Sequence, residues 1–141
     1  MSGLERTFVL LKPSCVERGL IGEVISRFEK KGLAIRGIKM LVMKREMAER
    51  LYEVHKGKEF YEGLINTVTG KRVVAILLEG REAIMVVRKM IGATDPAKAE
   101  PGTIRGDLGL EVTDNIIHAS DSKESFQREA RIFFEETELL A

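Results

Sequence analysis

At 141 residues the chain is the size of one domain, residues 1–141, and such a domain buries roughly 70% of the surface that its unfolded form exposes. Charged residues make up 32% of the sequence but the net charge is only +1 at pH 7, so bulk charge gives no reason to expect a nucleic acid or an anionic membrane as a partner. The single cysteine, Cys15, excludes an internal disulfide framework and a thiol-rich metal site, and favours a reducing, cytoplasmic setting.

The first predicted element is a strand in the apolar run from Thr7 to Leu11. It ends at Lys12 and Pro13, because proline cannot donate a hydrogen bond to a central sheet ladder. Charges flank the run on both sides and no small-residue cleavage pattern follows, so it does not resemble a signal peptide. No apolar run approaches the roughly 20 residues that span a bilayer. We therefore expect a soluble protein.

A helix, a long strand and two short helices are predicted next. The first helix ends at Gly32, the left-handed stop expected just past a helix, and its apolar stripe comprises Leu20, Ile21, Val24, Ile25 and Phe28. Leu33 to Met43 is typical of a partly exposed strand. The two short helical patterns lie on either side of the polar stretch HKGKE and comprise Met47, Leu51 and Val54, then Phe60, Leu64, Ile65 and Val68, ended by Gly70.

The second half of the chain contains two strands and two helices. Val73 to Leu78 is short and continuously apolar, as expected for a strand covered on both faces, and a helix after it ends at Gly92. Asn115 to His118 is the last predicted strand. A final helix follows, and its apolar positions at helical spacing are Phe126, Ala130, Phe133 and Phe134.

This order of elements predicts an α+β sandwich with a four-stranded sheet of split βαβ type and helices packed on it. The segment from Gly92 to Asp114 has little periodicity and contains two prolines and four glycines. Unstructured loops longer than about 12 to 15 residues are uncommon in compact domains unless they are functional or disordered. We therefore expect this long loop, before the last strand, to carry function.

His118 is expected at the carboxyl end of the last strand, where α/β proteins commonly bind ligands. Asp121 and Glu124 have the spacing of a capping box for the final helix, and Glu129 lies at the rim of that helix's buried face. One interpretation is a nucleophilic histidine held in one tautomer by Glu129 and steadied by Ser120. The alternative is an ordinary surface or core histidine beside a helix cap.

Cationic and aromatic side chains form two further groups. Lys12, Arg88 and Arg105 could surround one anion with Thr94 as a hydroxyl donor, an arrangement that phosphoryl transfer requires, although each charge alone could be solvated. Tyr52 and Phe60 flank HKGKE, and an exposed aromatic pair could stack on a base, at about 1 to 3 kcal/mol per base. Core packing is the alternative for Phe60.

Four segments together resemble nucleoside diphosphate kinase: LLKP at 10 to 13, Tyr52 with Phe60, GATDPAKAEPGTIRGD at 92 to 107 and NIIHASDS at 115 to 122. The resemblance covers nearly the whole chain in order. It implies a ferredoxin-like βαββαβ fold with an antiparallel sheet. It also implies a phosphotransferase that moves a γ-phosphate from a nucleoside triphosphate to a nucleoside diphosphate by a ping-pong mechanism and maintains cellular nucleoside triphosphate pools.

The resemblance also implies the roles of individual residues. His118 would be the nucleophile, supported by Glu129 and Ser120, with Lys12 as a further catalytic residue. The family pattern assigns nucleotide binding to Lys12, Tyr52, Phe60, Arg88, Thr94, Arg105, Val112 and Asn115; within this set, Asn115 with Lys12 would hold the ribose 3′-hydroxyl, and Phe60 with Val112 would sandwich the base.

Cofactor and assembly follow from the same resemblance. Mg²⁺ is expected to bind mainly through nucleotide phosphates and water, so no protein metal site is expected. A homohexamer is expected, with a homotetramer as the alternative. The sequence departs from the family pattern at Ser14, where an aspartate is usual, at Ala119, where a glycine is usual, and at Asp114, within VTD where GR is common.

Other interpretations of the same sequence are weaker. The segment before Gly70-Lys71 lacks the first glycine of a phosphate-binding loop, and His55 is expected to face solvent. A non-catalytic RNA-binding sheet should carry an aromatic-rich strand, which is absent. A catalytically silent kinase relative should have lost the histidine or a phosphate ligand, and this chain keeps them all.

Overall fold

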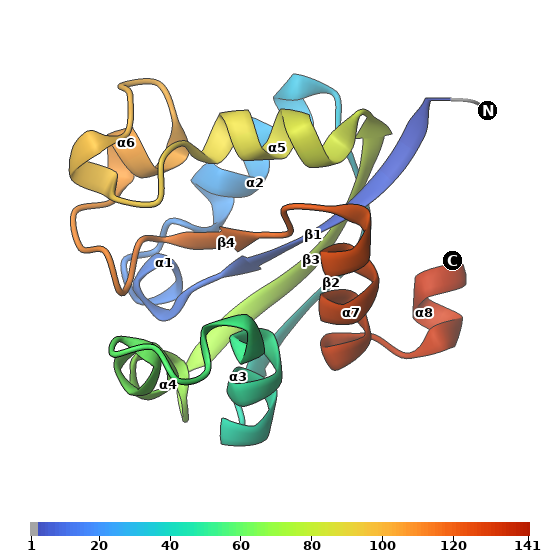
Figure 1. Ribbon diagram of the computed structural model, residues 1–141. Coiled ribbons are helices and arrows are strands. Elements are labelled where there is room, and N and C mark those ends of the chain that lie inside the picture. The colour runs from blue at the N-terminus through green and yellow to red at the C-terminus, as the bar shows by residue number, and fades with distance from the viewer. Residues whose placement is uncertain (1–2) are drawn as a thin grey trace.

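The computed structural model describes residues 3–141, which form a four-stranded sheet with helices around it (Figure 1). The strands are β1 (Leu4–Leu11), β2 (Ala34–Val42), β3 (Arg72–Arg81) and β4 (Ile117–Ala119). The α-helices are α1 (Pro13–Glu17), α2 (Ile21–Lys31), α3 (Arg45–Leu51), α4 (Tyr61–Val68), α5 (Ala83–Ile91), α6 (Ile104–Leu108), α7 (Lys123–Phe133) and α8 (Glu136–Leu140). The connections hold the 3-10 helices η1 (Glu53–His55) and η2 (Pro96–Lys98).

The strand order in the sheet is β2-β3-β1-β4, and every neighbouring pair is antiparallel. Central strand β1 pairs with β3 along its whole length and places Leu11 opposite Val74. Its carboxyl end also pairs with β4, which places Leu10 opposite His118. The predicted ferredoxin-like α+β sandwich is therefore confirmed.

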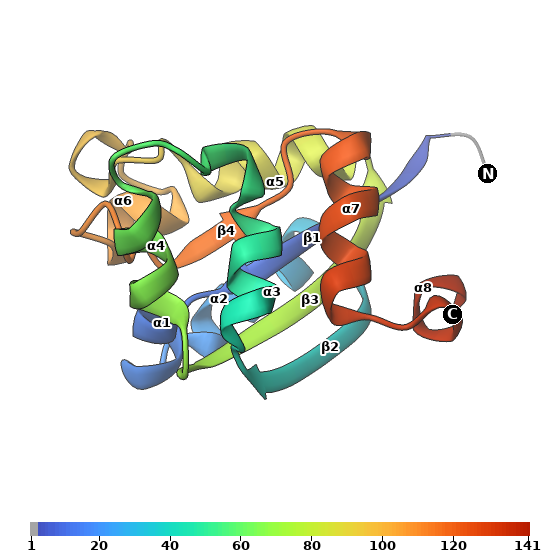
Figure 2. The same cartoon turned by 60° about the horizontal axis from the view of Figure 1, so that its bottom comes forward.

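Helices cover both faces of the sheet, with α2 and α5 on one face and α3, α4 and α7 on the other (Figures 1 and 2). Successive residues of β1 alternate between these layers, because side chains of a strand point to opposite faces. Val9 and Leu11 belong to the core under α2 and α5, and Phe8 and Leu10 belong to the core under α3, α4 and α7. Neither face is open for stacking bases as an RNA-recognition sheet would be.

Strand β2 is an edge strand whose outer side has no strand partner among residues 3–141. Ile38, Met40 and Val42 alternate along it, and all three are exposed although they are apolar. Natural proteins usually cover or charge such an edge, because its unpaired backbone groups can pair with another chain. This edge is therefore a surface suited to association.

The observed elements differ from the predicted ones mainly at their ends. Helices α1 and α8 were not predicted, since five residues each are too few to show a helical period. The last strand runs over Ile117–Ala119 and not over Asn115 to His118. Val54, which was placed in a helical stripe, lies exposed in η1, so that prediction is wrong.

The segment predicted as a long loop, Gly92 to Asp114, contains η2 and α6. Gly92 ends α5 with a φ of 86°, a conformation that suits glycine. At Gly106 a Cβ atom would lie 2.0 Å from the carbonyl oxygen of Glu100, so only glycine fits there. The loop is compact because its glycines allow these close approaches.

Candidate active site

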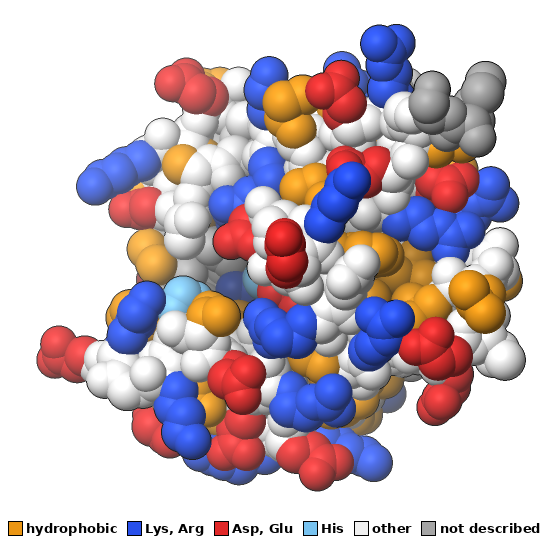
Figure 3. All heavy atoms as spheres, turned by 45° about the vertical axis from the view of Figure 1, so that its right-hand side comes forward, with side chains coloured by type: hydrophobic (Ala, Val, Ile, Leu, Met, Phe, Trp, Pro, Cys, Tyr) orange, Lys and Arg blue, Asp and Glu red, His pale blue; other side chains and the backbone are white. Residues whose placement is uncertain are grey.

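A cavity of about 430 Å³ opens beside β4, between the α3–α4 region, the end of α5 with its following loop, and α7. Figure 3 shows a hollow on this side of the molecule, with histidine and basic side chains at it. Among the predicted site residues, those that line the cavity are Lys12, Tyr52, Phe60, Arg88, Thr94, Arg105, Val112, Asn115, His118 and Glu129. Ser120 is buried behind them.

His118 points into the cavity because its register partner, Leu10, faces the layer of α3, α4 and α7. Its Nε2 atom lies 2.9 Å from Oε1 of Glu129, and the Ser120 hydroxyl donates to the same oxygen at 2.7 Å. A carboxylate only accepts hydrogen bonds, so Nε2 carries the proton in the neutral ring. Nδ1 has no hydrogen-bond partner within residues 3–141, and its lone pair is free.

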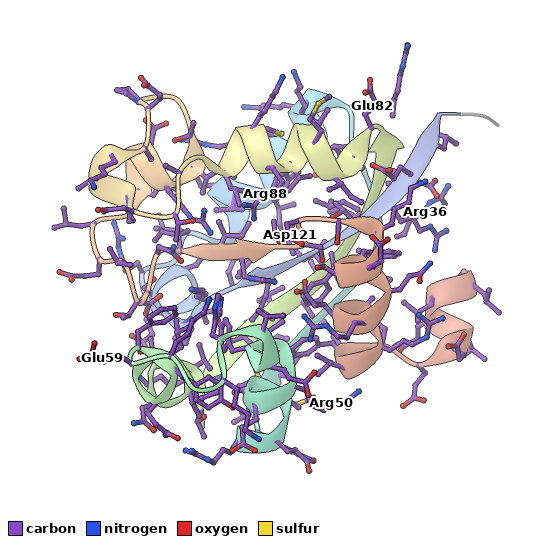
Figure 4. All side chains as sticks on the ribbon, viewed as in Figure 1. Arg36, Arg50, Glu59, Glu82, Arg88 and Asp121 are labelled. Carbon is purple, nitrogen blue, oxygen red and sulfur yellow. The ribbon has the colours of Figure 1, made fainter. Side chains whose placement is uncertain are left out.

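The predicted capping box at Asp121 and Glu124 is wrong. Ser122 is the N-cap of α7, and its hydroxyl oxygen accepts from the amide of Ser125 at 3.0 Å. Asp121 lines the cavity instead, and it accepts a hydrogen bond from the Ser125 hydroxyl that holds its pKa below the usual range. Figure 4 shows Asp121 where β4 leads into α7 and Arg88 on the facing side of α5.

Lys12 lies at the floor of the cavity with only 4% of its side chain exposed. Its Nζ atom donates to Oδ1 of Asn115 at 2.8 Å and lies 5.9 Å from the ring centre of Tyr52. Burial, with the nearby charge of Arg105, lowers the pKa of Lys12 to about 8. A bound anion would favour the charged form.

Arg105 is also buried, and its side chain spans three backbone carbonyls. It donates to the carbonyl oxygens of Gly92, Asn115 and Ile117 at 3.0, 3.3 and 2.6 Å. Burial, followed by the charge of Arg88, lowers its pKa to about 10. Arg105 therefore holds the loop against β4 and adds positive charge to the cavity.

The turn before β4 is strained at Ile116. Its φ is 75°, which is costly for a β-branched residue, and the amide of Ile117 donates to the Asn115 carbonyl at 2.9 Å. This three-residue turn aims the Asn115 side chain at Lys12. Ala119, by contrast, lies in regular strand, so the added methyl group there meets no strained backbone.

The outer part of the cavity is apolar and exposed. Phe60 and Val112 are 48% and 50% exposed, so the alternative in which Phe60 packs in the core is wrong. Tyr52 was expected to be exposed with Phe60, but it is buried. Its hydroxyl has no hydrogen-bond partner within residues 3–141, which leaves a donor free at the cavity floor.

Several cavity residues were not predicted. His55, expected to face solvent, is partly buried and lines the cavity, and its ring is tilted by 58° against that of Phe60 at a centroid distance of 5.2 Å. Ser125 and Arg128 line it from α7. Ser125 precedes Arg128 by three residues and Glu129 by four, spacings that place side chains on the same side of a helix, so the helical wheel could have identified both. No residue pattern marked His55.

The charge of the cavity is mainly positive. Its lysine and arginine residues are Lys12, Arg88, Arg105 and Arg128, and its carboxylates are Asp121 and Glu129. Among residues 3–141 no three His, Cys, Asp or Glu side chains are grouped so that they could hold a metal ion, and no helix there is long and apolar enough to cross a membrane. The cavity suits a polyanion with an apolar portion.

Comparison with known proteins finds similarity to one family along almost the whole chain. Residues 5–139 match the family model described as nucleoside diphosphate kinase. The nucleoside diphosphate kinase of Methanocaldococcus jannaschii is 62% identical over 135 residues, 96% of each chain.

Two solved structures are similar to this fold. The halophilic nucleoside diphosphate kinase of Halobacterium salinarum in complex with CDP has a TM-score of 0.92 and 43% identity, covering 95% of this chain and 90% of that one. The Borrelia burgdorferi enzyme, a transition-state mimic with bound vanadate and ADP, has a TM-score of 0.91 and 36% identity, covering 98% and 91%.

Proposed function

This chain belongs to the nucleoside diphosphate kinase family, and we propose that it transfers the γ-phosphate of a nucleoside triphosphate to a nucleoside diphosphate through a phosphohistidine at His118. It is a phosphotransferase, as its relatives are. The observation that carries the proposal is the environment of the His118 ring. Its Nε2 atom is hydrogen-bonded to Glu129, whereas its Nδ1 atom has no partner within residues 3–141 and lies in a cationic cavity. Such turnover would maintain cellular nucleoside triphosphate pools in the cytoplasm.

In the first half-reaction Nδ1 of His118 attacks the γ-phosphorus. A nitrogen–phosphorus bond forms while the bond from phosphorus to the β,γ-bridging oxygen breaks, and the nucleoside diphosphate leaves with that electron pair. Nε2 keeps its proton and its hydrogen bond to Glu129, whose negative charge stabilises the ring as it becomes positive. In the second half-reaction a terminal oxygen of another diphosphate attacks the phosphorus, the bond from Nδ1 to phosphorus breaks, and Nδ1 takes back the electron pair, which restores the neutral ring.

The cavity residues support this chemistry by position and charge. Lys12, Arg88, Arg105, Thr94 and the free hydroxyl of Tyr52 would bind phosphate oxygens, on which negative charge is spread during transfer. Asn115 with Lys12 would hold the ribose 3′-hydroxyl. Phe60 and Val112 would stack on the base, and stacking without hydrogen bonds to the base edge tolerates every base.

Mg²⁺ is proposed to bind with the nucleotide, mainly through its phosphates. The cavity fits this arrangement, because both Glu129 oxygens already have partners and Asp121 is the other carboxylate at the cavity. A protein cage of hard oxygen ligands would need more carboxylates. The metal would neutralise phosphate charge, and the protein residues would position the reacting groups.

We propose that the chain assembles as a homo-oligomer, a homohexamer or alternatively a homotetramer, and that it acts as a single domain. The exposed edge of β2 supports a two-fold contact between copies. Two antiparallel β2 strands would pair edge to edge and bring Ile38, Met40 and Val42 of both copies together. Sedimentation of the wild type against an Ile38→Lys variant tests this contact, and an unchanged mass would contradict it.

Incubation with γ-labelled ATP and Mg²⁺ tests the central proposal. The expected product is a labelled protein that loses its label in acid and keeps it in base, because phosphohistidine has this stability. His118→Ala should lose the label completely and still bind ADP. A label on serine, or normal turnover by the variant, would refute the mechanism; His55→Ala, which removes the other histidine, should still accept label.

A further inference from the structure

Two segments that meet at the cavity floor are joined by one hydrogen bond that the proposed chemistry does not use. The Ser14 hydroxyl, on α1, donates to Oδ1 of Asp114 at 2.6 Å. Two other bonds lie beside it: the Lys12 amide donates to the Ile116 carbonyl at 2.8 Å, and Lys12 Nζ donates to Asn115. Lys12 and Ser14 therefore make three hydrogen bonds to the consecutive residues Asp114, Asn115 and Ile116.

Asp114 is placed behind the cavity and not in its wall, since its neighbours Thr113 and Asn115 line the cavity and it does not. It is partly buried. It is therefore not a group that touches substrate. Any effect on transfer must pass through the residues that it holds.

The charge of Asp114 acts on Lys12. The titratable and charged groups that line the cavity together with Lys12 are Tyr52, His55, Arg88, Arg105, His118, Asp121, Arg128 and Glu129. Arg105 opposes protonation of Lys12, whereas Asp114 raises the Lys12 pKa and so partly offsets burial. The charge of Asp114 therefore acts on Lys12 in the direction opposite to that of Arg105.

The position of Asp114 also affects the strained turn. It immediately precedes Asn115 and Ile116, and a φ of 75° at Ile116 persists only where surrounding contacts hold it. Ser14 provides such a contact from α1. A short polar side chain at both positions is required, because the 2.6 Å bond joins a hydroxyl and a carboxylate directly.

From this geometry we propose that Ser14 and Asp114 are a pair of positioning residues for phosphoryl transfer. The hydrogen bond fixes the turn that aims Asn115 at Lys12, and the negative charge of Asp114 favours the cationic form of Lys12 against burial and Arg105. This proposal rests on the proposed function, because Lys12 and Asn115 are its nucleotide contacts.

The Asp114→Asn variant tests the charge of Asp114 separately from its hydrogen bond to Ser14. Asparagine keeps an oxygen for Ser14 but removes the charge, so the pKa of Lys12 falls and the cation is lost at lower pH. At about pH 6 the kcat/KM of the variant should stay within about twofold of wild type, and at about pH 9 it should fall by about fivefold or more relative to wild type. Glu111→Gln removes an exposed charge from the same loop and is the matched control.

Ser14→Ala tests the hydrogen bond separately from the charge of Asp114. It should lower kcat/KM by a similar factor at every pH, because the turn loosens while the charge stays. A pH-independent loss in Asp114→Asn, equal to that in Ser14→Ala, would overturn the charge role of Asp114. Unchanged kcat/KM in Ser14→Ala would overturn the positioning role of the hydrogen bond.

Titration of the Lys12 side-chain amine by NMR, in the nucleotide-free protein, gives a readout that needs no activity. The resonance is assigned by its loss in Lys12→Met. Its midpoint should move to lower pH in Asp114→Asn and stay in place in Glu111→Gln. If wild type transferred no phosphate but this midpoint moved, the proposed function would fail while the effect of Asp114 on Lys12 stood; an unmoved midpoint would reject that effect.

Discussion

The floor and the rim of the cavity are built from opposite kinds of residue. The floor consists of Lys12, Arg105, Asn115 and Glu129, with Ser120 buried behind them, and together with Thr7 these are the buried polar or charged residues within residues 3–141. Lys12, Arg105, Asn115, Ser120 and Glu129 each have a hydrogen bond, whereas the buried hydroxyl of Tyr52 has none within residues 3–141. The rim consists of Val54, Phe60 and Val112, all apolar and about half exposed or more.

This difference suggests that the floor carries out the reaction and that the rim binds the base. Buried polar groups are costly unless they are bonded, so the floor has one well-defined arrangement, as a reacting centre requires. An exposed apolar rim has no directional contacts, so it can accept different bases. Substitutions in the floor should therefore reduce the rate of transfer, and substitutions in the rim should reduce binding.

Glu129→Gln is expected to have the largest effect. The amide nitrogen could face Nε2 of His118 and favour the wrong tautomer, and the charge that stabilises the positive ring is lost. Phosphoenzyme formation in a single turnover should slow by about 100-fold to about 10,000-fold. Glu124→Gln on the exposed side of α7 is the control, and equal rates in the two variants would remove Glu129 from the reaction.

Lys12 provides a test of the floor through stability. Its folded pKa, about 8, lies below its ordinary value of 10.5 because the cation is buried. The folded protein therefore binds fewer protons than the unfolded chain between these values, and stability rises with pH there. Relative to Lys12→Met, the free energy of unfolding of the wild type should increase by on the order of 3 kcal/mol across this window.

Chemical denaturation at a series of pH values measures this difference. A nucleotide-free sample is required, because bound phosphate would keep Lys12 charged. A constant difference between wild type and Lys12→Met from about pH 8 to 10.5 would mean that the lysine is not desolvated in the folded protein.

Phe60→Ala should have the smallest effect and should change binding. Loss of one stacking surface should raise KM by about 5-fold to 150-fold, which corresponds to about 1 to 3 kcal/mol, with kcat nearly unchanged. The control is Leu110→Ala, an exposed apolar residue outside the cavity wall. A fall in kcat with unchanged KM would contradict the division between floor and rim.

Much of the fold could be predicted because its signals are local. Alternation and apolar runs identified the strands, and Gly32 and Gly92 were correctly predicted as helix ends, with positive φ in both cases. The shortest elements could not be predicted: α1 and α8 have five residues each, and α6 lies within a segment without apolar periodicity. A helical pattern needs more than one turn to be visible.

The candidate site was predicted in part from residue types and in part from the family resemblance. Helical spacing correctly predicted the side of α7 on which Glu129 lies, as its 2.9 Å contact with His118 shows. The burial of Tyr52 and the turn of Asp121 into the cavity could not be read from spacing. They depend on which neighbouring element covers each side chain.

The amino-acid sequence by itself determined the strand and helix order, the histidine with its acid on the following helix, and the set of cations available to bind phosphate. These follow from periodicity and residue chemistry, which act over a few residues. Only the tertiary structure decided that Nδ1 is the free nitrogen, that Ile116 is strained, and that Ser14 meets Asp114 across a separation of 100 residues. Such contacts depend on strand register and packing, and these are set by the whole fold.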